Sequence, residues 1–292
     1  MIRQGTQHSL QHSLIACTLL AAALLLAACS GASVITNSAS EPQDPGNALS
    51  PANLASLTAV VERNPSDAQA YNIRGAVYGQ AGQHEQALAD FNKAIGLDAR
   101  FAQAYANRGL LYQATNKFDL ALADYHKALG LDASYAPAYV GRGTVYRQKG
   151  QLLLALNDFN KAIALRPDNA KAYYNRGLLY QSQRQHQFAI DDFSNAITLT
   201  PQQQDLLAAR ALSYLAIDDT KSAATDLDEA VQLNTLNIQA WIARGLAYER
   251  LGNTEKAAGS YAKALSVNRE DKTAQAGFGR VGGQAGRQYQ AF

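Results

Sequence analysis

The stretch APAYVGRGTVYRQKGQLLLALNDFNKAIALRPDN, residues 136–169, decides the fold of this chain. In its first half, Tyr139, Gly143 and Tyr146 recur at i, i+4 and i+7, which places them on one face of a helix. In its second half, Ala155, Phe159 and Ala162 do the same. The stretch therefore predicts two short helices, separated by a turn around Gly150.

The same pattern returns along the chain at a constant interval, marked by Gly75, Gly109, Gly143 and Gly177. A glycine inside a helix costs roughly 1 kcal/mol relative to alanine, so its regular return indicates a packing reason. With no side chain at this position, two helix backbones can approach each other closely. The interval is 34 residues, a length typical of stacked-repeat architectures.

This pattern resembles the tetratricopeptide repeat, over six units that start at Ala68, Ala102, Ala136, Ala170, Gln204 and Ile238. The resemblance implies an all-α, right-handed superhelical solenoid of six helix-turn-helix repeats over residues 68–271. One departure is systematic, because an arginine stands where the family usually has an apolar residue before the glycine. We expect an N-terminal half-repeat over 51–66, whose helix starts at Ser50-Pro51, and a short cap followed by a mobile tail over 272–292.

The composition is that of a folded protein with no dominant charge. The chain has 292 residues, of which 17% are charged, and a formal net charge of +2. So balanced a surface carries no electrostatic signature of nucleic-acid or anionic-membrane binding. No cysteine follows Cys29, so the repeats hold neither disulfides nor zinc-thiolate sites.

Residues 1–28 have the pattern of a secretory leader, with Arg3 followed by an apolar run from Leu14 to Leu26. The run ends in Leu26-Ala27-Ala28-Cys29, which resembles the bacterial lipobox. The resemblance implies cleavage and lipidation at Cys29, a periplasm-facing protein and, from Ser30, sorting to the outer membrane. An ordinary signal peptide or a buried cysteine is the alternative. Residues 29–50 are expected to form the lipidated cysteine and a flexible tether.

Arginine and aspartate recur at fixed repeat positions, which predicts a structural ladder of ion pairs. Each aspartate lies nearly as far in sequence from the arginine of its own unit as from that of the next. Either pairing is compatible with these spacings; we expect Asp158 to pair with Arg176 of the next unit, and a charged strip for an ionic ligand is the functional alternative. The ladder comprises Arg74, Arg108, Arg142, Arg176, Arg210 and Arg244 with Asp90, Asp124, Asp158, Asp192 and Asp226.

No catalytic or metal-binding pattern is evident. The histidines of the repeats, His84, His126 and His186, have no metal-ligand spacing and are expected at the surface, and no nucleophile or phosphate-loop motif occurs. We therefore expect neither an enzyme nor a cofactor.

The family resemblance implies peptide binding along the concave face built by the first helices. Its expected residues are Asn107, Asn175, Leu110, Leu178, Leu212, Leu246 and Tyr174. The alternative is that these asparagines are merely tolerated and the leucines pack against neighbouring repeats. We expect a non-catalytic adaptor or scaffold for proteins or peptides of the bacterial cell envelope, held at the membrane by the lipid on Cys29. A structural envelope-integrity factor without a peptide ligand and an enzyme with an unrecognised site are the alternatives.

Overall fold

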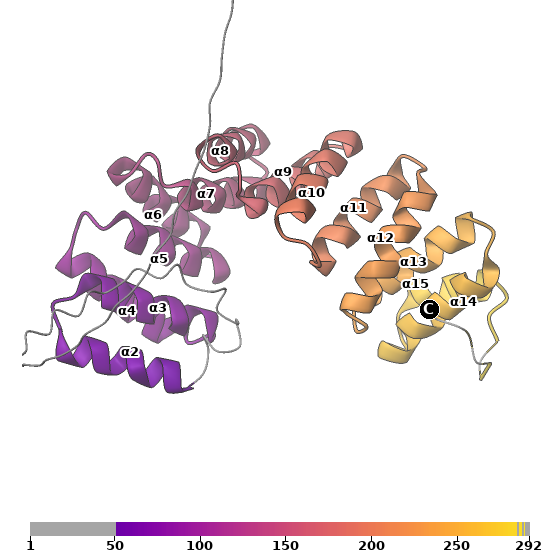
Figure 1. Ribbon diagram of the computed structural model, residues 1–292, viewed down its shortest axis with the longest axis horizontal. Coiled ribbons are helices and arrows are strands. Elements are labelled where there is room, and N and C mark those ends of the chain that lie inside the picture. Colours follow the sequence, from indigo (N-terminus) through magenta and orange to yellow (C-terminus); the bar gives the residue numbers. More distant parts are fainter. Residues whose placement is uncertain (1–50, 285, 288, 290–292) are drawn as a thin grey trace, which may run out of the picture. The chain divides into compact units, whose positions relative to one another are not determined.

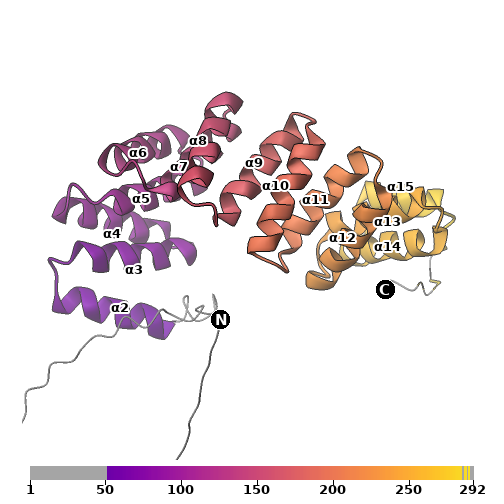
Figure 2. The ribbon, with the colours of Figure 1, turned by 45° about the horizontal axis from the view of Figure 1, so that its top comes forward.

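The computed structural model describes residues 51–284, 286, 287 and 289, and these form helices without strands. The predicted leader, the lipidation site Cys29 and the tether lie outside the described residues. All described helices fall within one compact unit, residues 44–292, and follow one another in sequence order (Figures 1 and 2). The helices are α2 (Pro51–Arg63), α3 (Ala68–Gln80), α4 (His84–Leu97), α5 (Ala102–Ala114), α6 (Phe118–Leu131), α7 (Ala136–Gln148), α8 (Leu152–Leu165), α9 (Ala170–Ser182), α10 (His186–Leu199), α11 (Gln204–Ala216), α12 (Thr220–Leu233), α13 (Ile238–Arg250), α14 (Thr254–Val267) and α15 (Lys272–Arg280).

The predicted all-α repeat fold is confirmed. Each unit consists of a first helix (α3, α5, α7, α9, α11 or α13) and a second helix (α4, α6, α8, α10, α12 or α14) that pack on each other. The first helices also contact the first helices of neighbouring units, whereas the described second helices do so far less. The first helices therefore form an inner layer and the second helices an outer layer.

Close approach within a unit explains the recurring glycine. A Cβ atom built on Gly143 would lie 2.8 Å from Cε1 of Phe159, which is too close for an unstrained contact. Gly177 meets Phe193 in the same way, at 2.7 Å. The fifth unit changes both partners together, since Ala211 replaces the glycine and Leu227 the aromatic ring, and both are fully buried.

The turn between the two helices of each unit needs a left-handed backbone. Gly82, Gly150 and Gly252 adopt φ values of 73–75° in the first, third and sixth units. Asn116, Arg184 and Asp218 occupy the same position in the other three units, with φ values of 58–61°. Because a non-glycine residue pays a steric cost in this conformation, the position is set by the geometry of the turn rather than by residue type.

The expected pairing of the arginine ladder is wrong. Asp158 pairs with Arg142 of its own unit and not with Arg176, through Nε–Oδ2 and Nη2–Oδ1 distances of 2.8 Å. The cause is the close contact of Gly143 with Phe159, because Arg142 and Asp158 directly precede these two residues and are brought together with them. The same two-point bond joins Arg74 to Asp90, Arg108 to Asp124, Arg176 to Asp192 and Arg210 to Asp226.

The third guanidinium nitrogen makes the link between units that sequence reasoning missed. Nη1 of Arg142 bonds Nδ1 of His126 in the preceding unit at 3.0 Å. Equivalent bonds from Nη1 join Arg108 to Asn92, Arg176 to Asn160 and Arg210 to Ser194.

The sixth unit reverses the arrangement. Arg244 pairs through Nε with Asp228 of the fifth unit at 2.6 Å, and its Nη1 donates to Ser260 of its own unit at 2.8 Å. Ser260 stands where the other units have the paired aspartate, and Asp228 stands at the repeat position of Asn92, His126, Asn160 and Ser194 in the preceding units, so the carboxylate and the neutral acceptor exchange places. In the sixth unit, the carboxylate that binds the arginine therefore belongs to the preceding unit, and the neutral acceptor belongs to the same unit.

Candidate peptide-binding clefts on the first-helix layer

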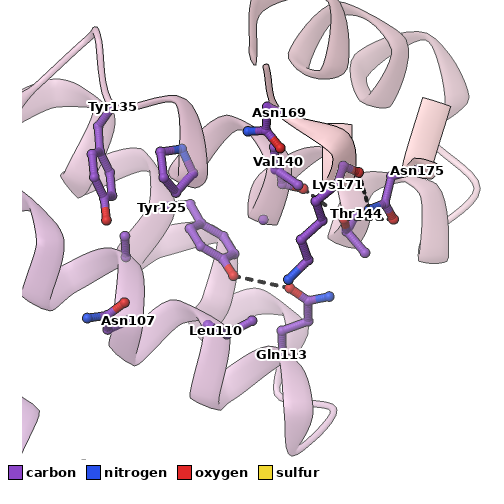
Figure 3. Close-up of a pocket in the computed structure, with 13 residues that line it drawn as sticks. Asn107, Leu110, Gln113, Tyr125, Tyr135, Val140, Thr144, Asn169, Lys171 and Asn175 are labelled. Atoms are coloured by element: carbon purple, nitrogen blue, oxygen red, sulfur yellow. Dashed lines mark hydrogen bonds between the residues drawn. The ribbon is translucent and has the colours of Figure 1, made fainter. Parts of the chain in front are cut away.

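Three clefts lie along the first helices of units one to five. The central cleft, about 270 Å³, is shown in Figure 3. The first helices of units two, three and four supply most of its lining, and Tyr125 enters from the second-helix layer. Its lining residues are Ala106, Asn107, Leu110, Gln113, Tyr125, Tyr135, Pro137, Val140, Gly141, Thr144, Asn169, Lys171 and Asn175.

The central cleft owes its shape to the pair Tyr125 and Gly141. A Cβ atom at position 141 would overlap the Tyr125 ring, so the ring occupies the place that a side chain would take. The Tyr125 hydroxyl reaches past Gly141 and donates to Oε1 of Gln113 at 3.1 Å (Figure 3). Burial raises the pKa of Tyr125, which keeps the hydroxyl protonated as a donor.

The clefts on either side share lining residues with the central one. Asn107 and Leu110 also line a cleft of about 320 Å³ with Ala76, Gly79 and Phe91 of the first unit. Lys171 also lines a depression of about 360 Å³ that includes Tyr174 and Asp205. The three hollows therefore follow one another along the inner layer.

The two asparagines expected to hold a peptide both line the central cleft, but their amides differ. Nδ2 of Asn107 donates to Oδ1 of Asn72 in the first unit at 2.9 Å, which leaves its own carbonyl oxygen and one N–H for a ligand. Asn175 is buried, donates to the backbone oxygen of Lys171 at 2.8 Å and accepts from Thr144 at 3.3 Å. Asn107 therefore has the larger unused hydrogen-bonding capacity.

The other expected groove residues are dispersed. Leu110 is 48% exposed and lines two of the clefts. Leu212 is equally exposed, at 49%, but lines none of the three. Leu178 and Leu246 pack against buried clusters that include residues of adjacent units, as the alternative interpretation of these leucines expects, and Tyr174 packs against Phe193.

Two cations lie on this layer, and one of them, Lys171, was missed from the sequence. The Lys171 side chain extends across the cleft toward Gln113 (Figure 3). Nε of Arg147, near Tyr174, is buried without a hydrogen-bond partner among the described residues, and burial lowers the pKa of this guanidinium. The signal for Lys171 is a break in the repeat pattern, since it stands where other units have Gln69, Gln103 or Gln239.

The described residues contain no group of histidine, cysteine, aspartate or glutamate side chains arranged to hold a metal ion. Within that same part of the chain, no helix is long and apolar enough to cross a membrane.

Comparison with known proteins identifies the repeats. Profiles of the TPR repeat match residues 75–116 and 143–183, and profiles of the tetratricopeptide repeat match 102–135, 170–203 and 238–271. No curated protein matches the chain in sequence.

Several solved structures share the fold. A chain of the APC/C Cut9–Hcn1 hetero-tetramer superposes with a TM-score of 0.69 at 20% identity over 78% of this chain, which spans 45% of that one. PilF of Pseudomonas aeruginosa gives a TM-score of 0.66 at 21% identity, covering 74% of this chain and 97% of its own. PilW, a type IV pilus biogenesis factor, gives 0.65 at 18% identity, covering 72% and 97%. At these identities the likeness shows the fold alone.

Proposed function

Because the chain belongs to the tetratricopeptide-repeat family, whose fold serves protein–protein interaction, we propose that it is a non-catalytic scaffold that binds an extended peptide segment of a partner along its first-helix layer. The observation that carries this proposal is the succession of three clefts joined by shared residues. Each hollow is large enough for about one or two side chains and smaller than the usual small-molecule pocket or at its lower limit. A chain of such hollows suits an extended segment with side chains spaced along it.

Different lining residues would make different kinds of contact with the peptide. Leu110 lies between two hollows and offers exposed apolar surface, at roughly 25 cal/mol per Å² buried. The unused groups of Asn107 can satisfy a peptide backbone whose water is displaced, because an amide both donates and accepts. Lys171 joins the central and fourth-unit hollows and would favour an acidic side chain between them.

The test uses two leucines at the same repeat position. Leu110→Asp should weaken binding of peptides selected on the wild-type protein from a random library by tenfold or more, measured by calorimetry. Leu212→Asp is the matched control, since Leu212 has the same exposure outside the clefts. Equal binding by both variants would place the peptide elsewhere, and a library that yields no binder would favour a structural role without a peptide ligand.

We further propose that the protein acts in the bacterial cell envelope, lipidated at Cys29 and facing the periplasm from the outer membrane. The lipobox-like sequence Leu26-Ala27-Ala28-Cys29 supports this proposal. Cys29→Ser should move the protein from the membrane to the soluble fraction of its own cells, and the wild-type N-terminus should map to a lipid-modified Cys29. An N-terminus at another residue would contradict lipidation without touching the peptide-binding proposal.

A further inference from the structure

A ridge of apolar side chains stands on the second helices of units two, three and four. Leu120, Leu154 and Phe188 occupy the same position near the start of α6, α8 and α10, and they are 50%, 48% and 59% exposed. Leu153, beside Leu154, is 77% exposed. The first, fifth and sixth units have Gln86, Ser222 and Lys256 at this position, so the ridge is confined to three consecutive units.

The ridge belongs to the outer layer and is separate from the peptide clefts. None of its four residues lines the three hollows of the first-helix layer. The Phe188 ring lies 5.4 Å from the Tyr180 ring, centroid to centroid, and is still 59% exposed. Clustered exposed apolar side chains of this kind mark a surface that binds another protein or a membrane.

Cations border the ridge in each of the three units. Lys117, Lys149 and Arg184 lie in or next to the turns that lead into α6, α8 and α10, and all three are exposed. Nζ of Lys149 bonds Asp119 at 2.6 Å, which ties the turn of unit three to the ridge of unit two. The fifth unit has Asp218 and Asp219 in the same turn. Since Asp119 offsets the charge of Lys149, Lys117 and Arg184 are the cations beside the ridge that have no ion-pair partner among the described residues.

The cations decide which partner fits. A second copy would bring a second Lys117 and Arg184 to the same interface, and like charges at an interface oppose association. A surface with negative charge over an apolar interior matches both features, because long cationic side chains can reach phosphates while neighbouring apolar side chains enter the acyl boundary.

We propose that this ridge, formed by Leu120, Leu153, Leu154 and Phe188 with Lys117, Lys149 and Arg184, binds the surface of an anionic lipid bilayer. The contact is peripheral and is made by the folded repeats themselves, independently of any lipid at Cys29. It presents the first-helix clefts on the other layer to partners away from the lipid.

The experiment measures co-sedimentation of residues 44–292 with vesicles. This part of the chain contains every described helix in one compact unit and lacks Cys29, so only the repeats can bind. Vesicles of phosphatidylglycerol mixed with phosphatidylcholine, at low salt, should bind the protein, and vesicles of phosphatidylcholine alone should bind it much less. Leu153→Gln with Phe188→Gln should lower the partition coefficient by about tenfold or more. Lys117→Gln with Arg184→Gln should lower it by a similar factor and remove most of its salt dependence.

Matched controls come from another unit. Leu236→Gln removes a leucine that is 72% exposed, and Lys221→Gln removes an exposed lysine, and neither should change vesicle binding. Circular dichroism of each variant checks the helices. Absence of binding by the wild type, or unchanged binding by both ridge variants, would overturn the proposal. So would a dimer in sedimentation velocity that is lost in the ridge variants while vesicles bind nothing.

Discussion

Removing the Asp158 carboxylate should show that the arginine ladder fastens the two helices of one unit. Side chains of Asp158 and Arg142 are only 8% and 16% exposed and share two bonds of 2.8 Å. Breaking a buried pair from one side costs about 3–5 kcal/mol, against about 0–1 kcal/mol for an exposed pair. Because Arg142 keeps some access to water, we expect Asp158→Ala to lower the free energy of unfolding by about 3 kcal/mol.

A double-mutant cycle assigns that loss to a partner. Asp158→Ala with Arg142→Ala should give a coupling energy of about 1.5–3 kcal/mol, and Asp158→Ala with Arg176→Ala should give less than about 0.5 kcal/mol. Unfolding is measured in urea, because guanidinium chloride would screen the charges. The exposed pair Arg166–Asp168 is the control and should couple by about 1 kcal/mol or less. Stronger coupling of Asp158 to Arg176 than to Arg142 would refute the assignment of the pair to one unit.

Two further predictions concern single contacts of the repeats. Nδ1 of His126 faces Arg142, its Nε2 bonds the Tyr146 hydroxyl at 3.1 Å, and burial together with Arg142 lowers the pKa of this imidazole despite Asp158. The unfolded chain then binds the proton more tightly, so stability should be complete above the ordinary histidine pKa of about 6.5 and fall as pH drops through the lower folded value. His126→Asn, which introduces the residue that two other units have at this position, should flatten the dependence of urea unfolding on pH between about 5 and 7, and an unchanged profile would contradict this. Gly177→Ala should destabilise by about 1–3 kcal/mol through its clash with Phe193, and adding Phe193→Leu should recover part of the loss, as in the Ala–Leu pair of the fifth unit; additive losses would argue against the clash.

The regular return of the glycines was enough to predict the fold, because in most units the same glycine of the first helix packs against the same aromatic position of the second helix. The same regularity revealed which arginines and aspartates form the ladder but not their pairing. Asp158 is nearly as close in sequence to Arg142 as to Arg176, so both pairings suit neighbouring helices, and the choice depends on Gly143 meeting Phe159 within a unit. The acceptors in the preceding unit were missed because their residue types vary among Asn, His, Ser and Asp.

The clefts and the ridge depend on residues that differ from one unit to the next, and the regular spacing of the repeat does not predict what such residues do. Tyr125 in place of phenylalanine looks conservative, yet its hydroxyl needs a glycine in the first helix of the next unit, and Gly141 is there. Tyr261 and Gly277 repeat this combination at the end of the array. Leu120 and Phe188 look like ordinary helix residues until the structure shows that neither is covered.

The guanidinium groups also set how the array would respond to a pulling force along its length. Two nitrogens of Arg142 hold a carboxylate inside one unit, whereas a single nitrogen crosses the joint to the unit before. Under tension, the contacts between units would therefore give way before the contacts within a unit. The polar links between units differ in strength, because Arg142 bonds an imidazole in the preceding unit and Arg244 bonds a carboxylate. An amino-acid exchange at this acceptor would therefore change the polar link between two units without altering the two-point bond inside either unit.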